Sequence, residues 1–407
     1  MSLNSTPSSD RIHISFFGKR NAGKSSVVNA VTGQSLSIVS DTLGTTTDPV
    51  QKAMELLPLG AVVIIDTPGI DDEGELGKLR VKRSYQVLNK TDVAVLIIDS
   101  TTGKSHEDNT LIERFKTKNI PFIVVYNKSD IARSEITEQN EIVVSAKTGE
   151  GINELKELIA CLAKSQENTK TIVSHMLKEN DTVILVVPID TSAPKGRLIL
   201  PQQQTIRDLL DHHCTAIVTQ PEELTSVINS LKTPPALVIT DSQAFARVSK
   251  DTPKNITLTS FSILFANYKG NLKLAVEGVK AIDTIQNGDK ILISEGCTHH
   301  RQCGDIGTVK LPALIKRYTG KTDINFEWSS GTEFPDDLSS YKLVIHCGGC
   351  MLNEREMKYR LKCAEDENIP ITNYGTAIAF MNGILKRSLA VFPEIENILI
   401  SREDKDE

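Results

Sequence analysis

RIHISFFGKRNAGKSSVVNAVTG, residues 11–33, decides the fold of the first part of this 407-residue chain. Apolar residues alternate through Ile12, Ile14 and Phe16, which predicts a strand, and the residues after the glycines predict a helix. Between them, residues 18–25 match the G-x-x-x-x-G-K-S pattern of a phosphate-binding loop. A strand, a glycine loop and a helix in this order predict an α/β fold that binds phosphate at a helix N-terminus.

The loop residues are the ones that a nucleotide and its Mg²⁺ ion require. The glycines let backbone N–H groups curl around the α- and β-phosphates. Lys24 is expected to reach the β- and γ-phosphates, and the Ser25 hydroxyl to coordinate Mg²⁺. The predicted nucleotide contacts in the loop are Gly18, Asn21, Ala22, Gly23, Lys24, Ser25 and Ser26.

A second segment, VVIIDTPG, completes the predicted phosphate and metal site. It places Asp66 at the end of a buried strand, where the carboxylate can bind the Mg²⁺ shell through water. Gly69 can then present its backbone N–H to a γ-phosphate. This segment therefore supplies the contacts that the glycine loop lacks.

Two further segments predict that the base is guanine. PFIVVYNKSD delivers its last polar residues at a strand end, and a carboxylate there accepts from both N1–H and the 2-amino group of guanine, which adenine does not offer. IVVSAKTG supplies a backbone donor for the guanine O6. The predicted base contacts are Asn127, Lys128, Asp130, Ser145, Ala146 and Lys147.

In this order and spacing the residues resemble the translation-factor-related GTPases, in particular the MnmE and Era group. SIVSDTLGTTTDP is similar to the switch segment of that group, which would make Thr46 the Mg²⁺-ligating threonine, with Thr45 and Thr47 as alternatives. Asn21 stands where potassium-dependent members carry a K⁺ ligand; the other interpretation is that it only shapes the loop. The catalytic contacts would then be Lys24, Thr46 and Gly69.

One residue of the small signalling GTPases is absent. Those proteins place a water-positioning glutamine directly after the DTPG segment, whereas this chain has Ile70 there. We therefore expect slow intrinsic hydrolysis. Asp71 and Asp72 follow, and we interpret this acidic pair as solvated.

The rest of the chain divides into two more predicted α/β domains. The helical pattern GINELKELIACLAKS closes a P-loop GTPase domain at 8–168. Strands and helices alternate again over 175–264, which predicts a small parallel sheet, and no catalytic motif appears there. Our hypothesis is that this domain arranges the other two by dimerisation. His212, His213 and Cys214 are interpreted as structural there, because adjacent helical residues diverge. The third domain is predicted at 266–407.

Grouped cysteines in the third domain favour metal or redox chemistry over a disulfide framework. DKILISEGC and YKLVIHCGGC predict two buried parallel strands that deliver thiols at their carboxyl ends. Zinc would recruit a histidine as its fourth ligand, and a 4Fe-4S cluster would leave one iron accessible. We favour an iron–sulfur cluster-binding domain over zinc and over a thioredoxin-like pair. The predicted ligands of this centre are Cys297, Cys347 and Cys350, with His299 and His346 as candidates for the fourth position.

The other cysteines are not assigned as ligands. Cys303 is interpreted as a bystander, with a spare ligand as the alternative. Cys161 and Cys363 lie in helical patterns and are predicted to be core residues.

The order of the three predicted domains resembles the HydF family of FeFe-hydrogenase maturation GTPases, and the resemblance covers essentially the whole chain. It implies a homodimeric scaffold that hydrolyses GTP with Mg²⁺ and K⁺ and holds a 4Fe-4S cluster through Cys297, Cys347 and Cys350. It further implies a transient di-iron subcluster as cargo, with radical-SAM maturases and apo FeFe-hydrogenase as partners.

The composition limits the competing interpretations. A net charge of −6 and the lack of an evident basic domain argue against nucleic acid as a partner. No apolar run approaches the roughly 20 residues that span a bilayer, and the N-terminus has no signal-peptide pattern, so we expect a cytoplasmic protein without membrane contact. The alternative function is an RNA-directed GTPase of the MnmE/Era kind with a zinc-binding C-terminal domain.

Overall fold

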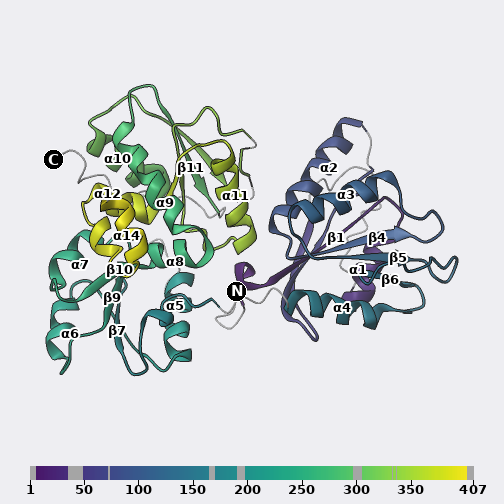
Figure 1. Cartoon of the computed structure of the whole chain (residues 1–407), viewed down its shortest axis with the longest axis horizontal. Helices are drawn as coiled ribbons and strands as arrows, with labels where there is room; N and C mark the ends of the chain where they lie inside the picture. Colours follow the sequence, from purple (N-terminus) through teal and green to yellow (C-terminus); the bar gives the residue numbers. More distant parts are fainter. Residues whose placement is uncertain are drawn as a thin grey trace. The chain divides into compact units, whose positions relative to one another are not determined.

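The computed structural model describes residues 6–34, 49–71, 74–164, 170–189, 198–296, 305–331, 333–335 and 337–400. The chain forms two compact units, Met1–Asn168 and Thr169–Glu407 (Figure 1). Each unit is an α/β structure, as the alternation of strand and helix patterns predicts. In the part of the chain that the structure describes, no helix is long and apolar enough to cross a membrane.

The first unit contains a sheet whose strand order is β2-β3-β1-β4-β5-β6 within the described residues. Neighbouring strands are parallel except β2, which runs antiparallel to β3. The strands are β1 (Ile12–Gly18), β2 (Val50–Leu56), β3 (Gly60–Asp66), β4 (Val93–Asp99), β5 (Phe122–Asn127) and β6 (Glu141–Val143). The helices are α1 (Lys24–Thr32), α2 (Gly74–Val87), α3 (His106–Thr117) and α4 (Ile152–Lys164).

Both faces of this sheet are covered, so its central strands are apolar throughout. In β4, Val93, Val95 and Ile97 pack in the core that includes residues of α1 and α4. The alternate residues of β4 pack in the core that includes residues of α3. Because both faces are buried, polar residues that act on a ligand are left to the carboxyl ends of the strands.

The second unit contains two sheets, and the strand pairs that the structure describes in them are parallel. One sheet has the order β10-β9-β7-β8, and the other has the order β12-β11-β13-β14. The strands are β7 (Thr182–Val186), β8 (Thr215–Thr219), β9 (Leu237–Thr240), β10 (Thr257–Ser260), β11 (Lys290–Glu295), β12 (Asn325–Ser330), β13 (Leu343–His346) and β14 (Ile371–Asn373).

Helices of the described residues connect and cover these two sheets. They are α5 (Leu200–Asp211), α6 (Leu224–Ser230), α7 (Phe245–Asp251), α8 (Phe261–Lys269), α9 (Leu272–Val279), α10 (Leu311–Thr319), α11 (Glu354–Asp366), α12 (Tyr374–Met381), α13 (Leu385–Ser388) and α14 (Pro393–Ile400). A π-helical turn, η5 (Ile306–Lys310), leads directly into α10.

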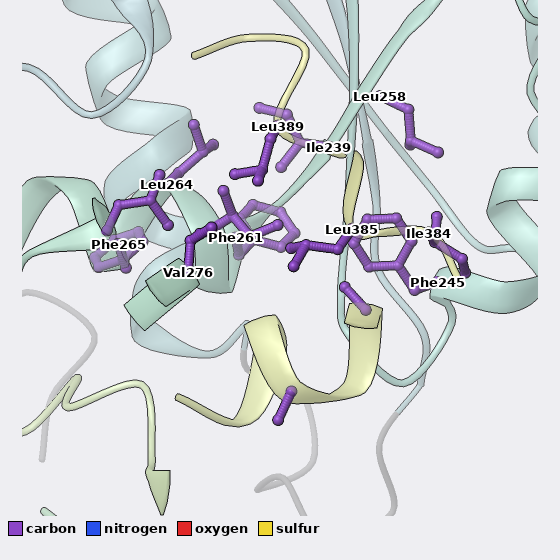
Figure 2. Close-up of a cluster of buried hydrophobic side chains, with 14 of the residues drawn as sticks. Ile239, Phe245, Leu258, Phe261, Leu264, Phe265, Val276, Ile384, Leu385 and Leu389 are labelled. Atoms are coloured by element: carbon purple, nitrogen blue, oxygen red, sulfur yellow. The ribbon is translucent and has the colours of Figure 1, made fainter. Parts of the chain in front are cut away.

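The two sheets of the second unit share one hydrophobic core. Figure 2 shows part of it, in which Ile239 of β9 and Leu258 of β10 lie with Phe261 of α8 and with Leu385 and Leu389 from the C-terminal part of the chain. Helix α8 continues to residue 269, so the boundary predicted between 264 and 266 falls inside it. The division of this half of the chain into separate domains stays a prediction.

Hydrogen bonds also join the C-terminal part of the chain to the sheet of β7–β10 and to the residues after α7. Thr259 Oγ1 donates to the Ser388 carbonyl over 2.9 Å. The Arg387 guanidinium donates to the carbonyls of Thr252 and Pro253, which follow α7. The structure around β10 is therefore completed by residues from much later in the chain.

We predict that Leu389→Ala weakens both sheets of the second unit together. Leu389 is fully buried in the shared core, and a buried Leu→Ala change costs about 2–5 kcal/mol of unfolding free energy. Hydrogen exchange followed by mass spectrometry should show faster exchange in both β9 and β11, with the exposed Lys386→Ala as the control. Faster exchange in only one of the two strands would contradict a shared core.

Candidate functional site

The phosphate loop lies between β1 and α1. Asn21 and Gly23 adopt left-handed backbone conformations, with φ of 63° and 83°, and α1 begins at residue 24. A side chain at Gly18 would place its Cβ 2.5 Å from the Ile97 carbonyl oxygen, and one at Gly23 would lie 2.2 Å from Asn127 Nδ2. Both positions therefore require glycine, because neighbouring strands approach the loop so closely.

Asp66 brings together the two loop residues predicted to bind phosphate and Mg²⁺. It ends β3, and its Oδ1 lies 3.0 Å from Lys24 Nζ. The Ser25 hydroxyl donates to Asp66 Oδ2 over 2.9 Å. A carboxylate, a hydroxyl and an ammonium that converge at a helix N-terminus fit a Mg²⁺–phosphate group, because each supplies an atom that such a group binds.

The predicted base-binding residues of two loops also lie together. Asn127 Nδ2 donates to the Ala22 carbonyl over 3.0 Å, and the Ala146 backbone N–H donates to Asn127 Oδ1 over 3.1 Å. Asn127 thus connects the phosphate loop to the loop after β6. The Ser145 hydroxyl donates to Asp130 Oδ1 over 2.8 Å. This bond orients the carboxylate that is expected to recognise guanine.

The lysines of these two base-binding segments differ in their surroundings. Lys128 has a φ of 70°, and its Nζ donates to Asp99 Oδ2 over 2.5 Å. Lys147 is largely exposed, and its Nζ lies 3.9 Å from Asp130 Oδ2. The ion pair fixes Lys128 beside the base site, whereas Lys147 is held only loosely.

Two charged residues beside the site were not identified from the sequence. Burial raises the pKa of Asp99, but the hydrogen bonds from Lys128 and Thr101 outweigh it and leave the pKa lowered. Glu107 lies 2.8 Å from Lys19, and that hydrogen bond lowers the pKa of Glu107 to about 2. For Asp99, its position at the carboxyl end of β4 was the available signal.

The segment that contains Gly69 lies against the phosphate loop. The Ile70 backbone N–H donates to the Gly18 carbonyl over 3.4 Å, which holds Gly69 close to the start of the loop. The side chain of Ile70 is buried in the core that contains residues of α3, so it is not directed at a phosphate. Ser26 is exposed in the first turn of α1.

The switch regions are described only in part. Asp71 is exposed, and its Oδ1 accepts a hydrogen bond from the Arg20 backbone over 2.8 Å. The remaining predicted switch residues lie outside the described residues; they are Thr45, Thr46, Thr47 and Asp72. Their assignment to Mg²⁺ or to solvent stays a prediction.

The second candidate site lies at the carboxyl ends of β11 and β13. The two strands are parallel neighbours, and Ser294 is paired with His346. Beyond this pair, the Cys347 backbone N–H donates to the Ser294 carbonyl over 2.8 Å. The strand register therefore places Cys347 beside Gly296, the residue that precedes Cys297 in the sequence.

Backbone donors point at the Cys347 sulfur. Gly296 and Gly349 donate their N–H groups to Cys347 Sγ over 3.0 and 3.4 Å. Burial raises the pKa of the Cys347 thiol to about 11, against the effect of these two donors. Burial likewise raises the pKa of Cys350, against the nearby charge of Lys269. Two N–H groups aimed at one sulfur fit a thiolate ligand of an iron–sulfur cluster, whose sulfurs accept such bonds.

Several predicted ligands cannot be placed. Cys297, His299 and Cys303 lie outside the described residues. Among the residues that are described, no group of three or more His, Cys, Asp or Glu side chains is arranged to hold a metal ion. The convergence of Cys297 with Cys347 and Cys350 therefore stays a prediction.

His346 is buried, and both of its ring nitrogens are engaged. Its Nδ1 lies 2.7 Å from the Cys347 carbonyl oxygen, and its Nε2 lies 3.1 Å from Arg360 Nη1. Because a carbonyl accepts and a guanidinium donates, the ring is neutral with its proton on Nδ1. Burial and the Arg360 charge lower the pKa of His346 to about 3. In this arrangement the ring has no lone pair to offer a metal.

Other residues around this site were not identified from the sequence. Tyr374 donates its hydroxyl to Glu295 Oε1 over 3.1 Å, one residue before Gly296. Trp328, the single tryptophan of the chain, donates from Nε1 to the Gly307 carbonyl over 3.1 Å. Gly307 belongs to η5, which follows the segment of Cys297 and Cys303 in the sequence.

The prediction that Cys161 is a core residue was wrong, because its side chain is exposed. The buried face of α4 carries Leu155, Ile159 and Ala163, and position 161 falls on the opposite face of the helix. Cys363 is partly buried and packs against a small apolar cluster between α11 and the sheet of β11 and β13.

The first part of the chain is similar to known GTPases. The 50S ribosome-binding GTPase model matches residues 13–128. The tRNA modification GTPase MnmE of Legionella pneumophila (strain Corby) is 36% identical over 149 residues, which are 35% of this chain and 32% of that protein. The MnmE protein of Paraburkholderia xenovorans is 31% identical over 179 residues, which are 41% of this chain and 37% of that protein. The chain thus spans about a third of the length of these curated relatives.

Among solved structures, the Era protein of Aquifex aeolicus, bound to GDP and aluminium fluoride, is 22% identical with a TM-score of 0.33. The match covers 51% of this chain and 93% of the Era chain. The geometry of the phosphate loop and the matched family model together define a P-loop GTPase domain, the class of domain that binds GTP and Mg²⁺.

The remainder of the chain identifies the family. The hydrogen maturase F dimerization domain model matches residues 172–270, and the hydrogen maturase F tetramerization domain model matches residues 273–391. The chain belongs to the hydrogen maturase F family of hydrogenase maturation GTPases. The two domain models also support self-association of the protein.

We predict that Asp130→Asn weakens GTP binding by about 10- to 100-fold, since a charged hydrogen-bond partner of the base is lost. An amide can donate where the carboxylate accepts, so the variant should instead favour xanthosine triphosphate, which has a carbonyl at that position. Fluorescent-nucleotide titration measures both affinities, with the exposed Glu154→Gln as the control. A variant that binds neither nucleotide would point to misfolding rather than to altered base recognition.

Proposed function

We propose that this chain is a GTP-hydrolysing scaffold that binds a 4Fe-4S cluster through Cys297, Cys347 and Cys350 and assembles or delivers the di-iron subcluster of FeFe-hydrogenase. The observation that carries the proposal is the Cys347 thiol at a strand end with two backbone N–H groups aimed at its sulfur. The neighbouring strand β11 leads directly to Cys297. Thiols delivered by adjacent parallel strands are suited to share one inorganic centre.

The fourth position of the cluster would be filled by a group other than cysteine. Because His346 uses both ring nitrogens in hydrogen bonds, it is the weaker of the two histidine candidates. His299 or an exchangeable oxygen ligand remains for this position. A cluster held by three thiolates keeps one iron that a second metal complex can approach, and this is the chemistry that the cluster would supply.

The turn between the two cysteines depends on the backbone conformation of one glycine. Gly349 has a φ of 61°, and a Cβ there would lie 2.5 Å from Met357 Sδ. A glycine is therefore required for the chain to turn between Cys347 and Cys350. The same thiols could also bind zinc, so metal analysis must distinguish zinc from iron.

GTP hydrolysis would control how the scaffold meets its partners. Lys24, Thr46 and Gly69 are assigned to the γ-phosphate and its Mg²⁺ ion, and Asn21 to a K⁺ ion that offsets the charge developing at the phosphate. The partners proposed are radical-SAM maturases and apo FeFe-hydrogenase, and the self-associating form is proposed to be a homodimer made through residues 175–264. Neither nucleic acid nor a membrane is proposed as a partner.

We predict that anaerobic reconstitution with iron and sulfide yields a brown protein with a reduced-state EPR signal. Cys297→Ser, Cys347→Ser and Cys350→Ser should each abolish most of the signal, because a serine oxygen is a poor ligand for a cluster iron. Cys161→Ser is the matched control, since that thiol is exposed in the other compact unit. Iron and sulfide analysis accompanies the spectra.

A colourless protein that binds zinc and never accepts iron and sulfide would overturn the proposal. That outcome would favour the second candidate, an RNA-directed GTPase with a zinc-binding C-terminal domain. The similarity to MnmE motivates this candidate, but it is confined to the GTPase domain. RNA that co-purifies with the protein at a fixed stoichiometry would support it.

We predict that GTP turnover is faster in KCl than in NaCl and that Asn21→Gly removes the difference. Asn21 has a φ of 63°, so glycine keeps the loop conformation and deletes only the side-chain amide. Loss of one group that stabilises the transition-state charge costs about 100-fold or more in rate. Steady-state phosphate release in KCl and in NaCl measures the two turnover rates. A variant that keeps its K⁺ stimulation would show that Asn21 only shapes the loop.

A further inference from the structure

Arg360 of α11 is a fully buried charged residue next to the cysteine site. Its Nε donates to Glu356 Oε1 over 3.1 Å. Its Nη1 donates to Ser294 Oγ over 3.2 Å and to His346 Nε2 over 3.1 Å. Its Nη2 donates to the Gly331 carbonyl. One guanidinium thereby joins α11 to β11, to β13 and to the turn after β12.

A buried ion pair of this kind adds little net stability to a fold. Removing two charges from water costs several kcal/mol per ion, and well-packed apolar residues of similar volume often stabilise a fold equally well. Arg360 and Glu356 are 0% and 5% exposed, so the cost of burial applies to both. The arrangement therefore suggests a task that an apolar residue could not perform.

Arg360 is connected to Cys347 through one residue of β11 and one residue of β13. His346, which accepts from Arg360, directs its Nδ1–H at the carbonyl of Cys347. Ser294, the second acceptor, receives the Cys347 backbone N–H at its own carbonyl. Both polar groups of the Cys347 backbone are thus held by residues that Arg360 itself holds.

We propose that Arg360 is a positioning residue for the metal centre, holding the end of β13 against β11 so that Cys347 presents its thiol to the cluster in a fixed orientation. The inference rests on the proposed cluster site and adds to it a residue that binds no metal. In this role His346 transmits the position of the guanidinium to the Cys347 backbone, as outer hydrogen-bond partners do around metal ligands.

Two variants separate this role from general stability. Arg360→Lys keeps the charge but cannot make the four contacts of the guanidinium at once. The double variant Arg360→Met with Glu356→Gln removes the ion pair without leaving a buried charge unpaired. The matched control is Lys358→Met, which removes a positive charge from the solvent-facing side of the same helix.

The experiment loads each full-length variant with iron and sulfide under limiting iron. Loss of an outer partner of a metal ligand costs about 10- to 100-fold in affinity, so we expect that loss for the double variant, a smaller one for Arg360→Lys and none for Lys358→Met. The EPR g-values of the cluster that still binds should shift in both Arg360 variants. Circular dichroism, the emission of Trp328 and GTP turnover before loading should match the wild type.

The outcomes are distinguishable. If wild-type protein accepts no cluster, the proposed function fails. If the wild type loads and both Arg360 variants bind the same amount of cluster with the same g-values, the positioning role is overturned while the proposed function stands. Should the double variant not fold, Arg360→Lys decides alone, because unchanged loading and an unchanged spectrum in that variant would also overturn the role.

Discussion

The parallel pairing of buried strands is the constraint on which both candidate sites depend. A strand covered on both faces can carry few polar side chains along its length, so polar and reactive groups are left to its carboxyl end. In the first unit this edge gathers Asp66, Asp99 and Asn127 around the phosphate loop. In the second unit the same edge brings Cys347, which follows β13, beside Gly296, which follows β11. Two unrelated chemistries are thus positioned by one rule of sheet construction.

The two sites differ in how the fold holds their ligands. At the GTP site, residues bond directly to one another: Lys24 and Ser25 to Asp66, and Asn127 to the phosphate loop. At the cysteine site, groups that are not predicted ligands make the hydrogen bonds. The Arg360 guanidinium binds Ser294 and His346, and the backbone N–H of Gly296 donates to the Cys347 sulfur. A phosphate site can be satisfied by its own side chains, whereas thiols make weak hydrogen bonds and need the surrounding polar groups to orient them.

Motif spacing predicted a P-loop GTPase, and the matched family model agrees, because the chemistry fixes residue types along short segments. The hydrogen bond from Asn127 to the Ala22 carbonyl was not among the predicted contacts, because the spacing does not show which loops touch. Arg360 was beyond prediction, because EREMKYRLKC has the charge density of a solvent-exposed helix and only the tertiary packing buries that one arginine. The strands TLTS (β10) and NFEWSS (β12) were missed since both contain few aliphatic residues. The apolar pattern around Cys161 correctly predicted a helix but not which residues of that helix are buried.

The packing of C-terminal residues against the sheet of β7–β10 has a consequence for biosynthesis. Leu385 and Leu389 complete a core that begins with Ile172 and Val173, much earlier in the chain. The GTPase unit emerges from the ribosome well before those leucines, so it can fold during translation, as N-terminal domains generally do. The second unit must wait until residue 389 has been synthesised. A product that ends before residue 385 would therefore lack part of the core on which both sheets of the second unit depend, while its GTPase unit would be complete.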